Sequence, residues 1–175
     1  MKSEKGEKIM NKDNIVNQLL SILILPFNVI VTMPLILVYL EESYLRFYRF
    51  SLIGGIIITG GLILLIITIG LFINVGRGTL APWDPTKKLV VVGPYKYVRN
   101  PMISGVVFIL LGETIIFKST YIGMWLISFF LINYLYFLLV EEPGLIKRFG
   151  KEYETYKQEV PRWIPRLRPW KNNED

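Results

Sequence analysis

Long apolar runs alternate with polar segments along this chain of 175 residues. Three runs carry no charged residue, over residues 14–40, 51–73 and 121–140, and a fourth over 101–117 contains Glu113. At about 1.5 Å per residue, the uncharged runs are long enough to cross the roughly 30 Å hydrocarbon core of a bilayer, and the fourth is barely so. The pattern predicts an all-α, polytopic membrane helix bundle with four transmembrane helices in a single membrane domain.

Prolines and glycines predict how the first two helices bend and pack. The run 14–40 exceeds the thickness of the core, and Pro26 and Pro34 are the places where it would bend. One bent helix and two short helices, which would give five spans, both remain open. The run 51–73 holds small residues that allow a neighbouring helix to approach closely. These are Gly54, Gly55, Gly60, Gly61 and Gly70.

Basic residues are concentrated in three polar stretches. The tail 1–13, the segment 74–100 and the chain from residue 141 onward together hold 17 of the 20 Lys and Arg. Because cytoplasmic segments of membrane proteins carry the excess of Lys and Arg, we expect both termini in the cytoplasm. The segments 74–100 and 141–170 would then share one membrane face. Short length and the absence of a targeting signal favour a prokaryotic plasma membrane.

Composition narrows the chemistry. Hydrophobic residues make up 52% of the chain, more than a soluble domain of this length would carry. There is no cysteine and no histidine, which excludes disulfides and thiolate metal sites and leaves acid–base work to Glu, Asp, Tyr or Lys. The net charge of +6 fits contact with the anionic headgroups of membrane lipids. We expect neither a metal nor a nucleic-acid partner.

Residues 93–105 form the most informative polar loop. Turn dipeptides at Gly93 and Pro94 and again at Asn100 and Pro101 indicate an ordered loop. Pro101 begins an apolar run, as proline often does at the first position of a helix. Arg99 and Asn100 therefore precede a helix N-terminus, where free N–H groups and the helix dipole favour an anion.

The C-terminal segment predicts a further helix on the same membrane face. Leu145, Phe149, Tyr153 and Tyr156 recur at helical spacing over residues 141–156, with Lys and Arg largely on the other face. This pattern is typical of a helix that lies on a membrane surface or against the loop.

Two oppositely charged groups should meet at this face. The short link 118–120 requires an antiparallel hairpin of the last two apolar helices, which places Glu141 and Glu142 near Arg99. Such a pair could bind a zwitterionic ligand, with Arg99 holding a carboxylate and a Glu holding an ammonium or ribose hydroxyls. It could equally be an exposed ion pair at headgroup level.

Three further residues stay ambiguous. Tyr95 and Tyr97 fit either a belt at the headgroups or the wall of an adenine pocket. Glu113 lies near the outer end of its helix and either pairs with Lys118, snorkels to the interface, or has a functional role.

Two motifs in order give the chain a resemblance to known enzymes. Residues 89–102 contain Leu-Val, Gly-Pro-Tyr and Val-Arg-Asn-Pro-Met, and residues 141–161 contain Glu-Glu-Pro, Phe-Gly, two tyrosines and Val-Pro. These pieces resemble the isoprenylcysteine carboxyl methyltransferase and phospholipid methyltransferase families of integral membrane enzymes. The resemblance covers residues 80–165, about half of the chain.

The resemblance implies S-adenosylmethionine as cofactor, S-adenosylhomocysteine as product, and a lipophilic acceptor that enters from the bilayer. It implies that the cofactor binds at the cytoplasmic ends of the last two helices, where a C-terminal capping helix covers it. It implies that Arg99, Glu141 and Glu142 act in catalysis. The residues that it implies for cofactor binding are Tyr95, Val98, Arg99, Asn100, Pro101, Gly105, Glu141, Glu142, Tyr153 and Tyr156. The adenine-pocket interpretation given above adds Tyr97.

The acceptor stays open at this stage. Asn100 stands where the eukaryotic prenylcysteine enzymes carry His, so a proton acceptor is missing at that position and the microbial members are the nearer likeness. A carboxylate acceptor, such as a prenylcysteine-like one, needs no base, whereas a lipid amine would need Glu141 or Glu142. Two other functions fit the same segments: a membrane reductase that binds a nicotinamide nucleotide, and a membrane scaffold without enzymatic activity.

Overall fold

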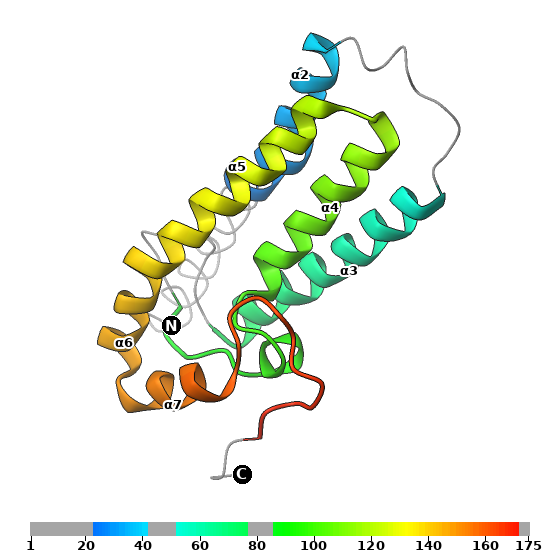
Figure 1. Ribbon diagram of the computed structural model, residues 1–175. Coiled ribbons are helices and arrows are strands. Elements are labelled where there is room, and N and C mark those ends of the chain that lie inside the picture. The colour runs from blue at the N-terminus through cyan, green and yellow to red at the C-terminus, as the bar shows by residue number, and fades with distance from the viewer. Residues whose placement is uncertain (1–22, 42–51, 77–85, 172–175) are drawn as a thin grey trace, which may run out of the picture.

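The computed structural model describes residues 23–41, 52–76 and 86–171, which form helices and loops with no β-strand in these ranges (Figure 1). The elements in chain order are the π-helix η1 (Leu23–Thr32), α2 (Met33–Leu40), α3 (Leu52–Asn74), the 3-10 helix η3 (Gly93–Lys96), α4 (Pro101–Phe117), α5 (Thr120–Tyr136), the π-helical turn η4 (Phe137–Glu141), α6 (Glu142–Phe149) and α7 (Lys151–Glu159).

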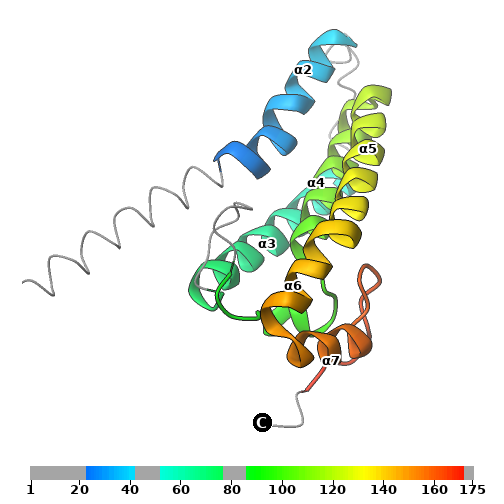
Figure 2. The ribbon, with the colours of Figure 1, turned by 90° about the vertical axis from the view of Figure 1, so that its left-hand side faces the viewer.

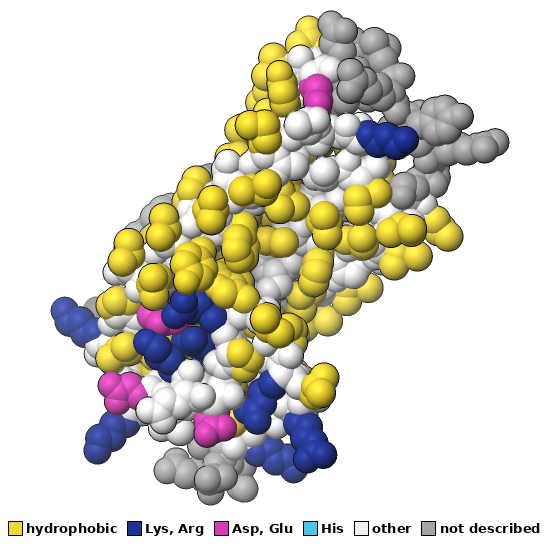
Figure 3. Space-filling view, viewed as in Figure 1, with side chains coloured by type: hydrophobic (Ala, Val, Ile, Leu, Met, Phe, Trp, Pro, Cys, Tyr) yellow, Lys and Arg dark blue, Asp and Glu magenta, His cyan; other side chains and the backbone are white. Residues whose placement is uncertain are grey.

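Among the described residues, two helices are long and apolar enough to cross a membrane. One is α3, and the other is the continuous helix Thr120–Phe149 formed by α5, η4 and α6. Pro26–Leu40 and α4 are shorter apolar helices. Apolar side chains such as Leu52 and Leu139 face outward, with exposed fractions of 75% and 68%, and they cover much of the surface in Figure 3. So much exposed apolar surface is typical of a fold that contacts lipid.

The helix bounds follow the apolar pattern closely. The helix α4 occupies 101–117 as expected, and α3 is displaced by one residue from the run 51–73. Within 23–40 the chain is helical throughout, with Pro26 inside the π-helix and Pro34 in the first turn of α2. Residues 14–22 of the first apolar run lie outside the described residues.

Glycines set the contact between α3 and α4. A Cβ at Gly61 would lie 2.8 Å from the carbonyl oxygen of Gly105, and one at Gly54 would lie 3.0 Å from that of Gly112. Gly54 and Gly61 are seven residues apart on α3, and Gly105 and Gly112 are seven residues apart on α4. The two helices therefore bring their backbones into contact along one face. The packing role expected of Gly55, Gly60 and Gly70 is absent, because a Cβ there would meet nothing within 4 Å among the described residues.

The helices α4 and α5 form the antiparallel hairpin that the short link predicts (Figure 1). Lys118 turns the chain with a left-handed backbone (φ 48°), and the Ser119 side chain accepts a hydrogen bond from the Ile122 N–H at 3.1 Å. The hairpin brings the start of α4 and the end of α5 to the same end of the bundle. Near the link, the Glu113 Oε2 atom is buried without a hydrogen-bond partner in the described part of the chain, so its role stays open.

The predicted single helix over 141–156 is wrong. It is split into α6, which continues α5, and α7, which turns across the end of the bundle (Figures 1 and 2). The break lies at Gly150, whose backbone (φ 54°, ψ −129°) is outside the helical region. Because that conformation favours glycine, the residue ends α6 and redirects the chain.

The helix α7 and the chain that follows it pack against the loop before α4 and form hydrogen bonds with it. Tyr153, Tyr156 and Val160 form a buried cluster with Leu89 and Val91 packed against it. The short run 89–92 thus contributes side chains to a small core. The backbone N–H of Arg99 donates to the Pro161 carbonyl at 2.9 Å, and the N–H groups of Arg166 and Trp170 donate to the carbonyls of Tyr97 and Lys96.

Candidate functional site

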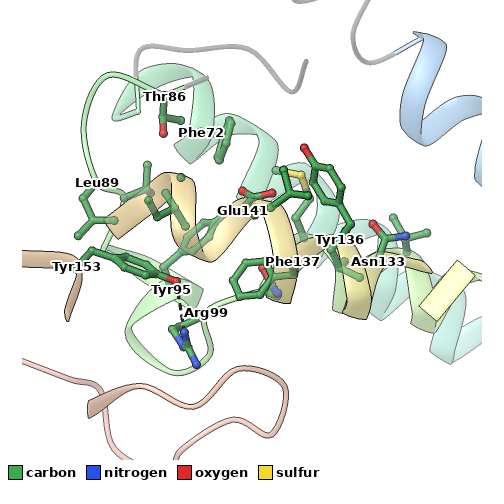
Figure 4. Close-up of a pocket in the computed structure, with 18 of the residues that line it drawn as sticks. Phe72, Thr86, Leu89, Tyr95, Arg99, Asn133, Tyr136, Phe137, Glu141 and Tyr153 are labelled. Atoms are coloured by element: carbon green, nitrogen blue, oxygen red, sulfur yellow. Dashed lines mark hydrogen bonds between the residues drawn. The ribbon is translucent and has the colours of Figure 1, made fainter. Parts of the chain in front are cut away.

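A cavity of about 590 Å³ lies where α4 begins and α5 passes through η4 into α6 (Figure 4). Its walls come from η1, α3, the loop 86–100, α4, the continuous helix Thr120–Phe149 and α7. Ligand cavities in proteins range over roughly 300–1,000 Å³ and are mostly apolar with a few placed polar groups. This cavity has that size and that mixture of side chains.

Arg99 and Asn100 supply buried donors at the start of α4. Asn100 is the N-cap residue but its side chain makes no capping hydrogen bond, and Pro101 follows at the first helical position. The Nδ2 atom of Asn100 and the Nε atom of Arg99 are buried without a hydrogen-bond partner in the described residues, and both residues line the cavity. Because unpaired buried donors are costly, the two atoms indicate a missing acceptor.

The two adjacent glutamates, Glu141 and Glu142, face different surroundings. Glu141 lines the cavity, and Figure 4 shows it among the lining side chains with Phe72 and Phe137 on either side. Glu142 is 2% exposed and lies outside the cavity lining. Consecutive helical residues differ by about 100° in direction, so one carboxylate can face the cavity while its neighbour faces away.

Glu142 is instead the centre of an ion cluster. Its Oε1 atom lies 2.6 Å from Arg99 Nη1 and 2.8 Å from Arg162 Nη2, and its Oε2 atom lies 2.9 Å from Lys157 Nζ. The Arg99 and Glu142 side chains are 7% and 3% exposed. The alternative of an exposed ion pair is therefore wrong for Arg99 and Glu142: the pair is buried, and it fixes the guanidinium that lines the cavity.

Three tyrosines form an aromatic wall. Tyr95, Tyr153 and Tyr156 all line the cavity. The Tyr156 hydroxyl donates to the Tyr95 carbonyl at 2.7 Å, and the Tyr153 hydroxyl accepts from Arg99 Nη1 at 3.3 Å (Figure 4). Burial raises the pKa of all three phenols, so they stay neutral at physiological pH.

Besides Glu142, four of the expected cofactor residues do not line the cavity. Tyr97 is 37% exposed, and Val98 is a core residue. Pro101 is buried in the first turn of α4. Gly105 contacts α3, where a Cβ would lie 3.0 Å from the Gly61 carbonyl oxygen. These residues position the loop and the helix around the site.

Several lining residues were missed by the sequence interpretation. They lie on one side of the continuous helix, before and after Glu141. Counting from Glu141 in steps of three or four residues reaches four of these six, and the other two, Tyr136 and Val140, directly precede Phe137 and Glu141. They are Asn133, Tyr136, Phe137, Val140, Gly144 and Arg148. Phe72 and Thr86 also line the cavity, and no sequence signal marks these two.

Arg148 adds a second cation to the cavity. Its Nη1 atom donates to the Thr86 carbonyl at 3.1 Å, which ties α6 to the loop before α4. Within the described ranges, no group of three or more Asp and Glu side chains is arranged to hold a metal ion. The polar side chains of the cavity lining are two guanidinium groups, one carboxylate, two amides, four phenols and the Thr86 hydroxyl.

Comparison with known proteins places this site within a family. The phospholipid methyltransferase family model matches residues 50–152, more than half of the chain. The match includes α3, α4, α5 and α6, and with them Arg99, Asn100 and Glu141. No curated protein sequence matches the chain. The family is one of membrane methyltransferases, in agreement with the apolar helices and with the resemblance of the two motifs. The chain belongs to the phospholipid methyltransferase family.

Proposed function

We propose that the protein transfers a methyl group from S-adenosylmethionine to a lipophilic acceptor at the cytoplasmic membrane face, releasing S-adenosylhomocysteine. The observation that carries this proposal is the pair of buried, unpartnered donors on Arg99 and Asn100, in a cavity whose other wall holds Glu141. Such a distribution matches a ligand with a carboxylate, an ammonium group and hydroxyls.

The side chains of the cavity fit the parts of this cofactor. Arg99 and Asn100 would hold its carboxylate, since two unsatisfied donors need an acceptor and a helix begins at the same place. Glu141 would hold the ammonium or the ribose hydroxyls. Tyr95, Tyr153 and apolar neighbours would form a dry wall for adenine. When bound, the cofactor supplies an electrophilic methyl group.

The apolar part of the cavity is suited to the acceptor. Val29 of η1, Leu65 of α3 and Phe129 of α5 line it, and all three belong to apolar helices. These side chains would bind the acceptor's hydrocarbon part and exclude water from the reacting atoms. A carboxylate acceptor needs no base, whereas an amine would lose its proton to Glu141.

The proposal includes the arrangement in the membrane. The four apolar helices would all span or enter the bilayer of a prokaryotic plasma membrane, with the N- and C-termini in the cytoplasm. Both cofactor-site segments, 74–100 and 141–170, would then lie on the cytoplasmic side, where α7 caps the cavity. The bias of Lys and Arg towards these segments supports that orientation.

Calorimetric binding of S-adenosylhomocysteine to the purified full chain tests the proposal, with two matched variants. Asn100→Leu removes the unpartnered donor with little change of volume, and affinity should fall by about tenfold or more, because hydrogen bonds to charged groups contribute about 1.5–3 kcal/mol. Asn133→Leu makes the same change elsewhere in the cavity, where the Nδ2 atom already donates to the Phe129 carbonyl at 2.8 Å. It should leave the cofactor affinity nearly unchanged.

Three results would contradict this assignment. Equal losses in the two variants would mean that Asn100 has no special role. Saturable binding of NADPH without binding of S-adenosylhomocysteine would favour the reductase. A folded protein that binds neither nucleotide would favour the scaffold.

A further inference from the structure

The segment that follows α7, residues 161–171, loops back beside the lower end of the helix bundle and then turns away towards the C-terminus (Figure 1). We refer to it as the strap. The Trp163 ring packs on one face of the long helix, with centroid distances of 5.1 Å to Phe130, 6.4 Å to Tyr134 and 6.3 Å to Phe137. Phe130 precedes Val140 by ten residues, or about 15 Å of helix. The tip of the strap therefore lies beside the apolar part of this helix.

The strap combines exposed apolar side chains with positive charge. Ile164 is 80% exposed and Leu167 is 98% exposed. Arg166, Arg168 and Lys171 lie in the same stretch, which contains no Asp or Glu. The Arg166 guanidinium donates to the Glu159 carbonyl at 2.9 Å and lies 3.9 Å from the Glu159 carboxylate, yet its side chain stays 31% exposed. Figure 3 shows Lys and Arg gathered mainly at this end of the molecule, below the apolar surface. Apolar residues next to cations are the composition of segments that bind the boundary between headgroups and acyl chains.

The strap also holds the cavity residue Arg99 from two directions. The Pro161 carbonyl accepts from the Arg99 backbone N–H at 2.9 Å. Arg162 donates from Nε to Glu142 Oε1 at 2.9 Å, and the same oxygen binds Arg99 Nη1. Arg162 thus acts on the site through Glu142 and does not line the cavity. Any contact that fixes the strap also fixes the guanidinium at the cavity edge.

We propose that an anionic phospholipid surface binds the strap, with Ile164 and Leu167 entering the acyl boundary and Arg166, Arg168 and Lys171 contacting lipid phosphates. The occupant is lipid because the strap packs on the helix that itself faces the bilayer and because its charge is complementary to anionic headgroups. Docking holds Arg162 against Glu142, so it keeps Arg99 in place. Anionic lipid then strengthens cofactor binding without entering the cavity.

A site-specific label tests the docking directly. The chain has no cysteine, so Leu167→Cys carries a single NBD fluorophore in the full-length protein. The matched control is Glu154→Cys, exposed on α7. Both proteins are reconstituted in nanodiscs of phosphatidylcholine, with and without phosphatidylglycerol. We expect the label at position 167 to be quenched by nitroxide lipids and shielded from an aqueous quencher, most strongly with phosphatidylglycerol, and the label at 154 to remain accessible to water.

Charge neutralisation separates the two parts of the proposal. Arg166→Gln, Arg168→Gln and Lys171→Gln combined should abolish the difference between the two lipid compositions. Equal accessibility of positions 167 and 154 in both nanodiscs would overturn docking. Shielding that appears only when two chains share one nanodisc would assign the surface to a second copy of the chain and would equally overturn the proposal.

The effect on the cofactor rests on the proposed function and has its own measurement. The affinity for S-adenosylhomocysteine should be severalfold higher with phosphatidylglycerol, and the triple Gln variant should lose that gain. Equal affinity in both lipids, with the label still shielded, would overturn the coupling alone. If no nucleotide binds in either lipid while the label is shielded, the proposed function fails and docking stands.

Discussion

A glutamate stands next to each end of the helical segment formed by α5 and η4 (Thr120–Glu141), but the two carboxylates have opposite surroundings. At the first end, Glu41 at the C-terminus of α2 accepts a hydrogen bond from the Ser119 hydroxyl and lies 3.0 Å from the Thr120 N–H and 3.5 Å from the Tyr121 N–H. It is partly exposed. At the other end, Glu142 is 2% exposed and binds three cations.

The difference shows how burial decides what an ion pair does. A carboxylate near water exchanges one set of good hydrogen bonds for another, so its net contribution to stability is small. Removing a buried carboxylate that binds cations is costly, because the cations are left in the protein interior without a counter-charge. The first end is therefore a helix cap, and the second end is an obligatory part of the site.

The largest expected effect is at the buried end. Glu142→Gln keeps the shape but leaves Arg99, Arg162 and Lys157 without a counter-charge, so the free energy of unfolding should fall by about 3–5 kcal/mol. The matched control is Glu141→Gln, whose carboxylate faces the cavity, and it should change stability by less than about 1 kcal/mol. Thermal unfolding in detergent measures both. Similar losses in the two variants would refute the separation of the adjacent carboxylates.

The sequence predicted the helices well because an apolar run in a membrane protein leaves few alternatives. The bounds of α4 match the run 101–117, and the hairpin follows from the link 118–120. The loop with Arg99 and Asn100 was found from turn chemistry and from the position of Pro101. These signals are local, and local signals are readable from one sequence.

The parts that the sequence did not predict depend on contacts between distant segments. The partner of Glu142 in the strap, Arg162, is twenty residues away along the chain, and no periodicity links them. The role of Gly105 depended on which helix face meets α3. That Phe72 lines the cavity likewise depends on how α3 packs against segments distant in the sequence. The break at Gly150 is a different case, because glycine after a basic last turn is a local helix-stop signal that the sequence interpretation did not use.

An intermediate effect is expected at the close contact between α3 and α4. Gly61→Ala places a Cβ 2.8 Å from the Gly105 carbonyl oxygen, so α3 and α4 must separate, at a cost of about 1–3 kcal/mol. Gly60→Ala is the neighbouring change on the same helix and meets nothing within 4 Å among the described residues. It should be neutral or slightly stabilising, because alanine favours helix by up to about 1 kcal/mol. Equal thermal midpoints for the two variants would contradict the close contact.

The smallest effect is expected at the exposed end and depends on pH. The hydrogen bond from Ser119, opposed by burial and aided by the Thr120 and Tyr121 amides, lowers the pKa of Glu41 below its ordinary value of 4.5. A lowered folded-state pKa means that the carboxylate stabilises the fold above about pH 4.5 and loses this effect as the pH falls through the folded value. Glu41→Gln should therefore be less stable than the wild type by about 0.3–1 kcal/mol near neutral pH, the range for a carboxylate at a helix N-terminus. The difference in thermal midpoint should narrow in acid, and Ser119→Ala, which removes the first donor, should narrow it too. A difference that stayed constant from neutral pH into acid would mean that Glu41 acts through packing and not through its charge. The two glutamates would then differ in how their side chains pack, and not in how burial affects a charged carboxylate.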